Sequence, residues 1–128
     1  MIELRAIGRV ESSLNDPADA PLQGHEGAPE AVLVFEPDVV EALDGIAAGD
    51  RIILLTWLDR ARRDVLRVHP RGDPQNPVQG VFNTRSPERP NPIGLHEVEV
   101  LAVDGGAVTV RPLEAVHGTP IVDVKPVL

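Results

Sequence analysis

The sequence predicts an all-β fold, a barrel or a sandwich, in a single small domain over residues 1–128 with at most one or two short helices and a long proline-rich loop. Short apolar stretches with partial alternation recur along the chain, and turn residues bound each of them. A chain of 128 residues with 42% hydrophobic content supplies one compact core and is too short for two ordinary domains. Only one stretch carries helix signals, so the strands must build the core.

Eight stretches have the length and patterning of strands. The hairpin between 98–101 and 107–110 is indicated by Asp104-Gly105-Gly106, because glycine adopts the positive φ of tight turns. A short helix is expected over Asp38–Leu43, begun by Pro37 or Asp38 and stopped by Asp44-Gly45. The expected strands are Ile2–Val10, Ala31–Phe35, Arg51–Leu58, Val65–Val68, Gly80–Phe82, Val98–Val103, Ala107–Val110 and Ile121–Val124.

Two long segments are expected to be irregular. Residues 12–29 contain few large apolar side chains and have no evident role in the core. Residues 70–92 hold six of the thirteen prolines, and each proline removes a backbone donor and fixes φ. The second segment is therefore neither an inner strand nor a helix, and long ordered loops of this kind are commonly functional in small domains.

The charge is unevenly distributed. The formal net charge of −8 argues against a protein that holds RNA mainly by electrostatics, since phosphate neutralisation needs clustered Lys and Arg. Residues 60–89, however, carry seven arginines against three acids, a net +4, which leaves −12 on the rest. A basic segment on an acidic body suits a restricted anionic ligand, although arginines that simply pair with nearby acids remain an alternative.

Several chemistries are excluded or unsupported. The chain has no cysteine, which removes disulfides, thiolate metal sites and cysteine nucleophiles. No Gly-x-Gly-x-x-Gly motif follows a strand, and Ser86 lies in no Gly-x-Ser-x-Gly elbow. The histidines lack metal-ligand spacing, so no metal site is expected; they are His25, His69, His96 and His117. The chain begins without a basic, apolar leader and has no bilayer-length apolar run, so we expect a soluble cytoplasmic protein without membrane contact.

The stretch Gly80–Leu95 is the most informative in the chain. We expect a buried strand to end at Phe82 and deliver a loop that its prolines stiffen. Arg85 and Arg89 offer planar donors and Asn91 a bidentate amide, which makes a rigid polar wall able to meet substrate. A proline-rich closure of the barrel with surface arginines is the alternative.

Residues 80–94 resemble the signature of the TsaA-like, or TrmO-type, tRNA methyltransferases, Gly-Val-Phe-Ala-Thr-Arg-Ser-Pro-x-Arg-Pro-Asn-Pro-Ile-Gly, and differ mainly at Asn83. Residues 113–126 are similar to that family's Leu-Asp-Gly-Thr-Pro-Val-Leu-Asp-Ile-Lys-Pro-Tyr segment. The resemblance extends to residues 6–12, 20–23 and 56–60, and so covers nearly the whole chain.

The resemblance implies a β-barrel that binds S-adenosyl-L-methionine in a folded pose, as a homodimer with the site near the interface. It implies N6-methylation of the threonylcarbamoyl-adenosine beside the tRNA anticodon, with the anticodon loop as partner. Leu22, His117 and Val127 replace the family's usual arginine, aspartate and tyrosine. The family's cofactor contacts transfer onto Pro21, Leu22, Gln23, Asp59, Arg60, Arg85, Leu95, Arg111, Pro112, Leu113 and Glu114.

Methyl transfer from a sulfonium is an in-line displacement, so positioning of donor and acceptor is the main requirement. The acceptor N6 must also lose a proton, for which Asp123 and His117 are the candidates, with Asp59 behind them. Asp123 can instead pair with Lys125 or Arg111. Because the chain has only Trp57, Phe35 and Phe82 on which bases could stack, two alternatives stay open: an S-adenosylmethionine-binding module and a methyltransferase with a non-tRNA substrate.

Overall fold

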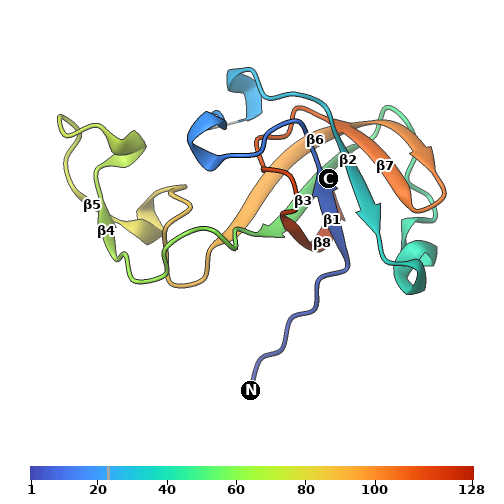
Figure 1. Cartoon of the computed structure of the whole chain (residues 1–128), viewed down its shortest axis with the longest axis horizontal. Helices are drawn as coiled ribbons and strands as arrows, with labels where there is room; N and C mark the ends of the chain where they lie inside the picture. The colour runs from blue at the N-terminus through green and yellow to red at the C-terminus, as the bar shows by residue number, and fades with distance from the viewer. Residues whose placement is uncertain (23) are drawn as a thin grey trace.

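Six antiparallel strands close into a barrel in the order β1-β2-β7-β6-β3-β8 (Figure 1). The structure, a computed structural model, describes residues 1–22 and 24–128. Because each strand pairs on both sides, the barrel leaves no open sheet edge. The predicted all-β barrel is confirmed. The strands are β1 (Gly8–Glu11), β2 (Ala31–Phe35), β3 (Arg51–Trp57), β6 (Ile93–Asp104), β7 (Ala107–Arg111) and β8 (Pro120–Pro126).

Alternating side chains of these strands fill the barrel. Along β2 and β3 every second residue is buried, as the period of two in a strand requires. Leu33, Leu54, Val98 and Val110 are completely buried in this core. The hydrophobic stripes seen in the sequence therefore point inward and position the polar residues that lie in the same rows.

A small arm and several single turns complete the chain. Strands β4 (Arg67–Val68) and β5 (Gln79–Gly80) form a separate two-stranded sheet that stands away from the barrel (Figure 1). The expected helix is the 3-10 helix η3 (Pro37–Leu43), after which Gly45 has a φ of +96°. The other 3-10 turns are η1 (Pro17–Asp19), η2 (Gly24–Glu26), η4 (Pro70–Gly72) and η5 (Val81–Asn83). No helix among the described residues is long and apolar enough to span a membrane.

Three strand predictions need correction. The strand expected from Ile2 starts only at Gly8, because Ile2 and Leu4 are exposed and pair with no neighbouring strand. The strand expected over Gly80–Phe82 ends at Gly80, and Phe82 is 82% exposed on a 3-10 turn. Strand β6 begins at Ile93, five residues before its expected start at Val98. The predicted hairpin is confirmed, since β6 and β7 pair around Gly105, whose φ is +59°.

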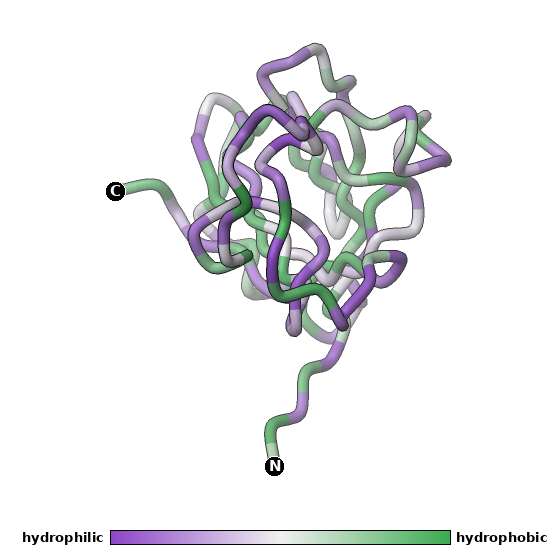
Figure 2. The backbone as a smooth tube through the Cα atoms, turned by 90° about the vertical axis from the view of Figure 1, so that its left-hand side faces the viewer, coloured by the Kyte–Doolittle hydropathy of each residue, from purple (hydrophilic) through white to green (hydrophobic). Residues whose placement is uncertain are grey.

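The barrel is irregular where β3 meets β8. Leu55 pairs with Asp123 and Thr56 pairs with Ile121, so Val122 is an extra residue in β8. Such a bulge bends a strand and re-aims the side chains beside it. Here it lies beside Thr56, which pairs with Gly94 on β6. Both ends of the chain extend away from this body (Figure 2).

Candidate functional site

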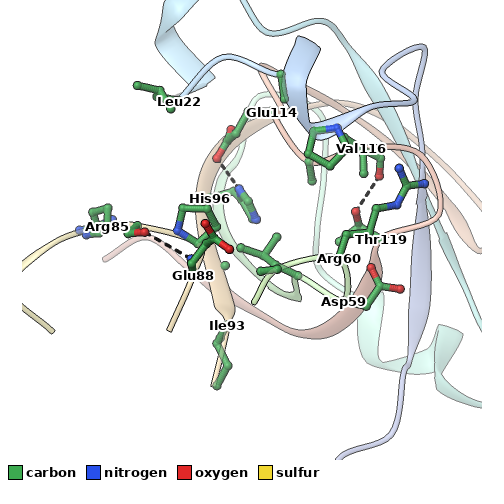
Figure 3. A pocket seen from close by; sticks show the side chains of 18 of the residues that line it. Leu22, Asp59, Arg60, Arg85, Glu88, Ile93, His96, Glu114, Val116 and Thr119 are labelled. Carbon is green, nitrogen blue, oxygen red and sulfur yellow. Dashed lines mark hydrogen bonds and ion pairs between the residues drawn. The ribbon is translucent and has the colours of Figure 1, made fainter. Parts of the chain in front are cut away.

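One end of the barrel opens into a cavity of about 490 Å³, within the range of small-molecule sites (Figure 3). Segments far apart in the sequence form it, and most of its wall is apolar. The lining residues come from the loop around η1, the turn after β3, the proline-rich loop, the start of β6 and the segment before β8. They are Pro17, Ala18, Ala20, Pro21, Leu22, Leu58, Asp59, Arg60, Ala61, Arg85, Ser86, Pro87, Glu88, Arg89, Ile93, Gly94, Leu95, His96, Glu114, Ala115, Val116 and Thr119.

A chain of three polar side chains forms the inner part of this site. The Nε2 atom of His96 lies 2.7 Å from the Thr56 hydroxyl, and Nδ1 lies 2.5 Å from Oε1 of Glu114. Thr56 is fully buried, the His96 side chain is 5% exposed and that of Glu114 is 16% exposed. His96 and Glu114 both line the cavity (Figure 3), and Glu114 is the more exposed of the two.

Strand alternation explains why these groups meet. Gly94, His96, Val98 and Val100 are the inward row of β6, and Thr56 continues the inward row of β3. Because it has no Cβ, Gly94 leaves room for the Thr56 hydroxyl and the His96 ring. A Cβ on Gly94 would collide with the Thr56 hydroxyl and would lie 2.7 Å from His96 Nε2.

Arg89 organises the proline-rich wall from within. Its guanidinium donates to the carbonyl oxygens of Thr84 and Ser86 at 3.0 Å and to that of Val81 at 2.8 Å. The Thr84 hydroxyl also donates to the Val81 carbonyl, at 2.9 Å. These bonds use the planar fork of arginine to fix a loop that has few backbone bonds of its own. Arg89 therefore shapes the wall predicted from the sequence.

Arg63 fastens the outer side of the same loop. It donates to the Pro90 carbonyl at 2.7 Å and to Oδ1 of Asn91 at 2.8 Å. Its guanidinium carbon also lies 5.1 Å from the centroid of the Trp57 ring, a cation–π distance. Asn91 is thus engaged with Arg63 and does not line the cavity.

The basic segment divides into paired and free arginines. Arg62 pairs with Asp64; the hydrogen bond between them lowers the pKa of the carboxyl and raises that of the guanidinium. Arg71 pairs with Glu26. The side chains of Arg67 and Arg85, by contrast, form no hydrogen bond or ion pair with the residues that the structure describes. Of these two, Arg85 lines the cavity, where it offers a positive charge to an anionic group.

The loop of residues 12–22 closes over the cavity, although the sequence predicted no core role for it. Arg60 donates to the Asn15 carbonyl at 2.8 Å. The backbone N–H of His117 donates to the Leu14 carbonyl at 2.6 Å, and His117 Nδ1 accepts from the Ser12 N–H at 3.2 Å. These bonds tie the loop to the end of β3 and to the turn before β8.

The structure gathers eight of the residues suggested by the sequence around this one cavity: Pro21, Leu22, Asp59, Arg60, Arg85, Arg89, Leu95 and Glu114. Leu113 is fully buried, Arg111 pairs with Glu99 on the outside, and Pro112 lies between them. None of these three lines the cavity, nor do Asn91 and His117. Gln23 lies outside the described residues.

Asp123 faces a different part of the molecule. It lines a second hollow of about 660 Å³, together with residues of η3 and of β8. Its carboxylate accepts a bond from Lys125 at 2.9 Å, and this bond, more than any other contact, lowers the pKa of Asp123. The pairing with Lys125 that the sequence left open is the one present.

Sequence reasoning missed His96 and Thr56 as site residues. His96 was considered only for metal ligation, and among the described residues no cluster of His, Cys, Asp and Glu could hold a metal. The signal that identifies His96 is its place in the alternation of the strand, because it lies in the same inward-facing row as Val98 and Val100. If the predicted strand had been extended back to Ile93, the His96 ring would have been expected in the same buried row as the core valines.

The family model of the tRNA-methyltransferase O N-terminal domain matches residues 9–128. The chain belongs to this family. A probable S-adenosyl-L-methionine-binding protein of Methanothermobacter thermautotrophicus is 42% identical over 98% of this chain and 89% of its own length. An S-adenosyl-L-methionine-binding protein of Archaeoglobus fulgidus is 43% identical over 95% of this chain and 86% of its own.

Among solved structures, the crystal structure of TrmO from Pseudomonas aeruginosa matches with a TM-score of 0.79 and 25% identity. The match covers all of this chain but only 56% of that one. This chain of the TrmO N-terminal family thus spans about half the length of that TrmO and nearly all of the two archaeal relatives.

Proposed function

We propose that this chain is an S-adenosyl-L-methionine-dependent methyltransferase that N6-methylates the threonylcarbamoyl-adenosine beside the anticodon of tRNA. Membership of the tRNA-methyltransferase O N-terminal domain family supports methyl transfer, and relatives named as S-adenosyl-L-methionine-binding proteins support the cofactor. The observation that carries the proposal is the single cavity at which eight residues suggested by sequence meet.

The cavity fits the chemistry of the cofactor. When bound, S-adenosyl-L-methionine supplies a methyl group activated by a positively charged sulfur. Arg85, whose guanidinium has no partner among the described residues, can bind its carboxylate, and Asp59 can bind its amino or hydroxyl groups. Pro21, Leu22 and Leu95 offer apolar surface to the adenosine. Arg111, Pro112 and Leu113 directly precede Glu114 in the chain and do not themselves line the cavity.

In this proposal tRNA is recognised by the basic segment of residues 60–89, which reaches the cavity at Arg60, Arg85 and Arg89. Arg67 and Arg85 carry charges that no described acid neutralises, and both lie in the segment of net charge +4. Free arginines of this kind bind phosphates while the acidic body limits non-specific binding. Because tRNA is the proposed substrate, the proposed compartment is the cytoplasm.

The mouth of the cavity also supports the proposed homodimer. Leu22, Ile93 and Leu95 line it and are 54%, 44% and 47% exposed. Exposed apolar side chains beside a cavity gain stability when another surface covers them. A second copy that covers them would complete the wall of the cofactor site.

A second candidate function follows from the names of the archaeal relatives. The relatives that this chain covers to 89% and 86% of their own length are named for cofactor binding alone. A binding module without catalysis would hold the cofactor and transfer nothing. This alternative and the methyltransferase differ in one measurable product.

The test incubates the purified protein with methyl-labelled S-adenosyl-L-methionine and tRNA from a host that leaves threonylcarbamoyl-adenosine unmethylated. Labelled N6-methylated nucleoside in the digest supports the methyltransferase, and cofactor binding without label on any tRNA supports the binding module. Arg85→Ala should weaken cofactor binding at least tenfold in calorimetry. The matched control is Arg67→Ala, an equally unpaired arginine on β4 that does not line the cavity and should leave cofactor affinity unchanged.

A further inference from the structure

The charged side chains around the cavity differ in how free and how well oriented they are. Asp59 is exposed at the rim, and a carboxylate oxygen of Glu88 accepts the backbone N–H of Arg62 at 3.2 Å. Both ring nitrogens of His96 are engaged. The Glu114 side chain, by contrast, is mostly buried; one of its carboxylate oxygens is held by His96, and the other has no partner among the described residues.

The free oxygen of Glu114 opens into the cavity. Oε1 is bonded to His96, while Oε2 has no partner among the residues that the structure describes. No side-chain oxygen or nitrogen that is buried in the described part of the chain lacks a partner. Since Glu114 lines the cavity, Oε2 must therefore be accessible from it.

Thr56 sets the ring tautomer that holds this carboxylate. The Thr56 hydroxyl contacts His96 Nε2 and has no other hydrogen-bond partner in the described chain. A Thr56 hydroxyl that accepted from Nε2 would leave its own buried proton without an acceptor, and an ionised Glu114 carboxylate can only accept. Both contacts therefore favour a ring with its proton on Nδ1, donated to Oε1 of Glu114, and a Thr56 hydroxyl that donates to Nε2. A base oriented by a second group that is itself oriented by a third is the arrangement of general-base sites.

We propose that Glu114 is the proton acceptor of the methyl-transfer reaction and that His96 and Thr56 are its positioning residues. This assignment rests on the proposed function and replaces Asp123 and His117 as the candidate base, since neither lines the cavity. As the acceptor nitrogen bonds to the methyl carbon, the sulfur keeps the electron pair of the bond that breaks. The nitrogen's proton passes to Oε2 of Glu114. One carboxylate and one sulfonium thus become a carboxylic acid and a neutral thioether, and charge balances.

The main test is Glu114→Gln, which keeps the shape and the bond to His96 but cannot accept a proton. We expect the single-turnover rate at saturating cofactor to fall about 10²- to 10⁴-fold, the usual contribution of a general base. Cofactor affinity in calorimetry should stay within about threefold. The matched control is Glu97→Gln on the outer face of β6, where Glu97 pairs with Arg51; it should keep the wild-type rate.

The positioning role has its own readouts. His96→Asn retains an N–H near the place of Nδ1 and should recover part of the rate that His96→Leu loses. In wild-type protein, ¹⁵N NMR of the His96 ring should show the proton on Nδ1, and Thr56→Val should shift the ring toward the other tautomer. This measurement needs neither cofactor nor activity.

Three results would overturn the assignment. Glu114→Gln could react at the wild-type rate, or it could lose cofactor affinity more than tenfold with a normal rate at saturation, which would make Glu114 a cofactor ligand only. The ring proton could also lie on Nε2. A wild-type protein that labels no tRNA would refute the proposed function and this step together, whereas an active wild type with an equally active Glu114→Gln would refute the step alone.

Discussion

Alanine substitution of three glycines measures how tightly the inner part of the site is packed. In Gly94→Ala the new Cβ would collide with the Thr56 hydroxyl and would lie 2.7 Å from His96 Nε2, both buried. Overpacking of this kind costs about 1–3 kcal/mol, against a gain of about 0.4–1 kcal/mol from a stiffer unfolded chain. At about 4 °C per kcal/mol, a domain of this size should lose up to about 10 °C in Tm.

The other two glycines bracket that value. In Gly8→Ala the Cβ would meet backbone, with the Val34 carbonyl oxygen at 2.5 Å, and backbone yields less than side chains, so the loss should exceed that of Gly94→Ala. In Gly80→Ala nothing lies within 4 Å and φ is −62°, so stability should be unchanged or slightly higher. Thermal melts followed by circular dichroism give the order. Equal Tm values for the Gly94 and Gly80 variants would refute the packing argument.

Two further predictions concern single contacts. Arg89→Lys should destabilise the protein by about 1–3 kcal/mol in urea unfolding and weaken cofactor binding, because an ammonium cannot serve three carbonyl oxygens as the guanidinium does; unchanged values for both would contradict its role in the loop. Lys125→Gln should raise the pKa of Asp123 in an NMR titration, since the Lys125 bond is what mainly holds that pKa below its usual value. A carboxyl whose pKa is lowered in the folded state stabilises the protein at pH values above its unfolded-state pKa, and this stabilisation is lost as the pH falls through the folded-state pKa. Because Lys125→Gln already lacks part of this stabilisation, the variant should lose slightly less stability than wild type below about pH 4.

Alternation of apolar and polar residues was sufficient for the all-β class, because it is visible in the sequence wherever one strand face is buried and the other exposed; the choice of a barrel came from the family resemblance. The sequence placed Ala31–Phe35 at its observed bounds and identified the turn at Gly105. It failed where a partner decides the conformation, since Ile2 and Leu4 alternate like a strand but lie beside none. The prediction of a buried strand ending at Phe82 was wrong for the same reason, because an apolar residue type does not show whether another surface covers the side chain.

The site was predictable only where it coincides with a recognisable segment. The proline-rich loop and Arg85 were found because their residue types are unusual together. The link between His96 and Glu114 joins residues 18 apart on different segments, and single-sequence spacing does not indicate such a contact. Asp123 is the opposite case: this conspicuous acid near a matched segment lies in a different hollow and pairs with Lys125.

The buried polar chain itself can be tested as a feature kept for function. A barrel core gains nothing from a threonine, a histidine and a glutamate where apolar residues of similar volume would pack, and replacing whole buried polar networks in this way is often neutral or stabilising by about 1–4 kcal/mol. The combined variant Thr56→Val, His96→Leu, Glu114→Leu should therefore be at least as stable as wild type in urea unfolding, yet transfer no methyl group. His96→Leu alone should be the least stable, because it leaves the Thr56 hydroxyl and Oε1 of Glu114 without partners, at a cost of about 1–3 kcal/mol. If the combined variant were instead the least stable, the chain would be needed for folding, and its presence in the core would carry no argument for catalysis.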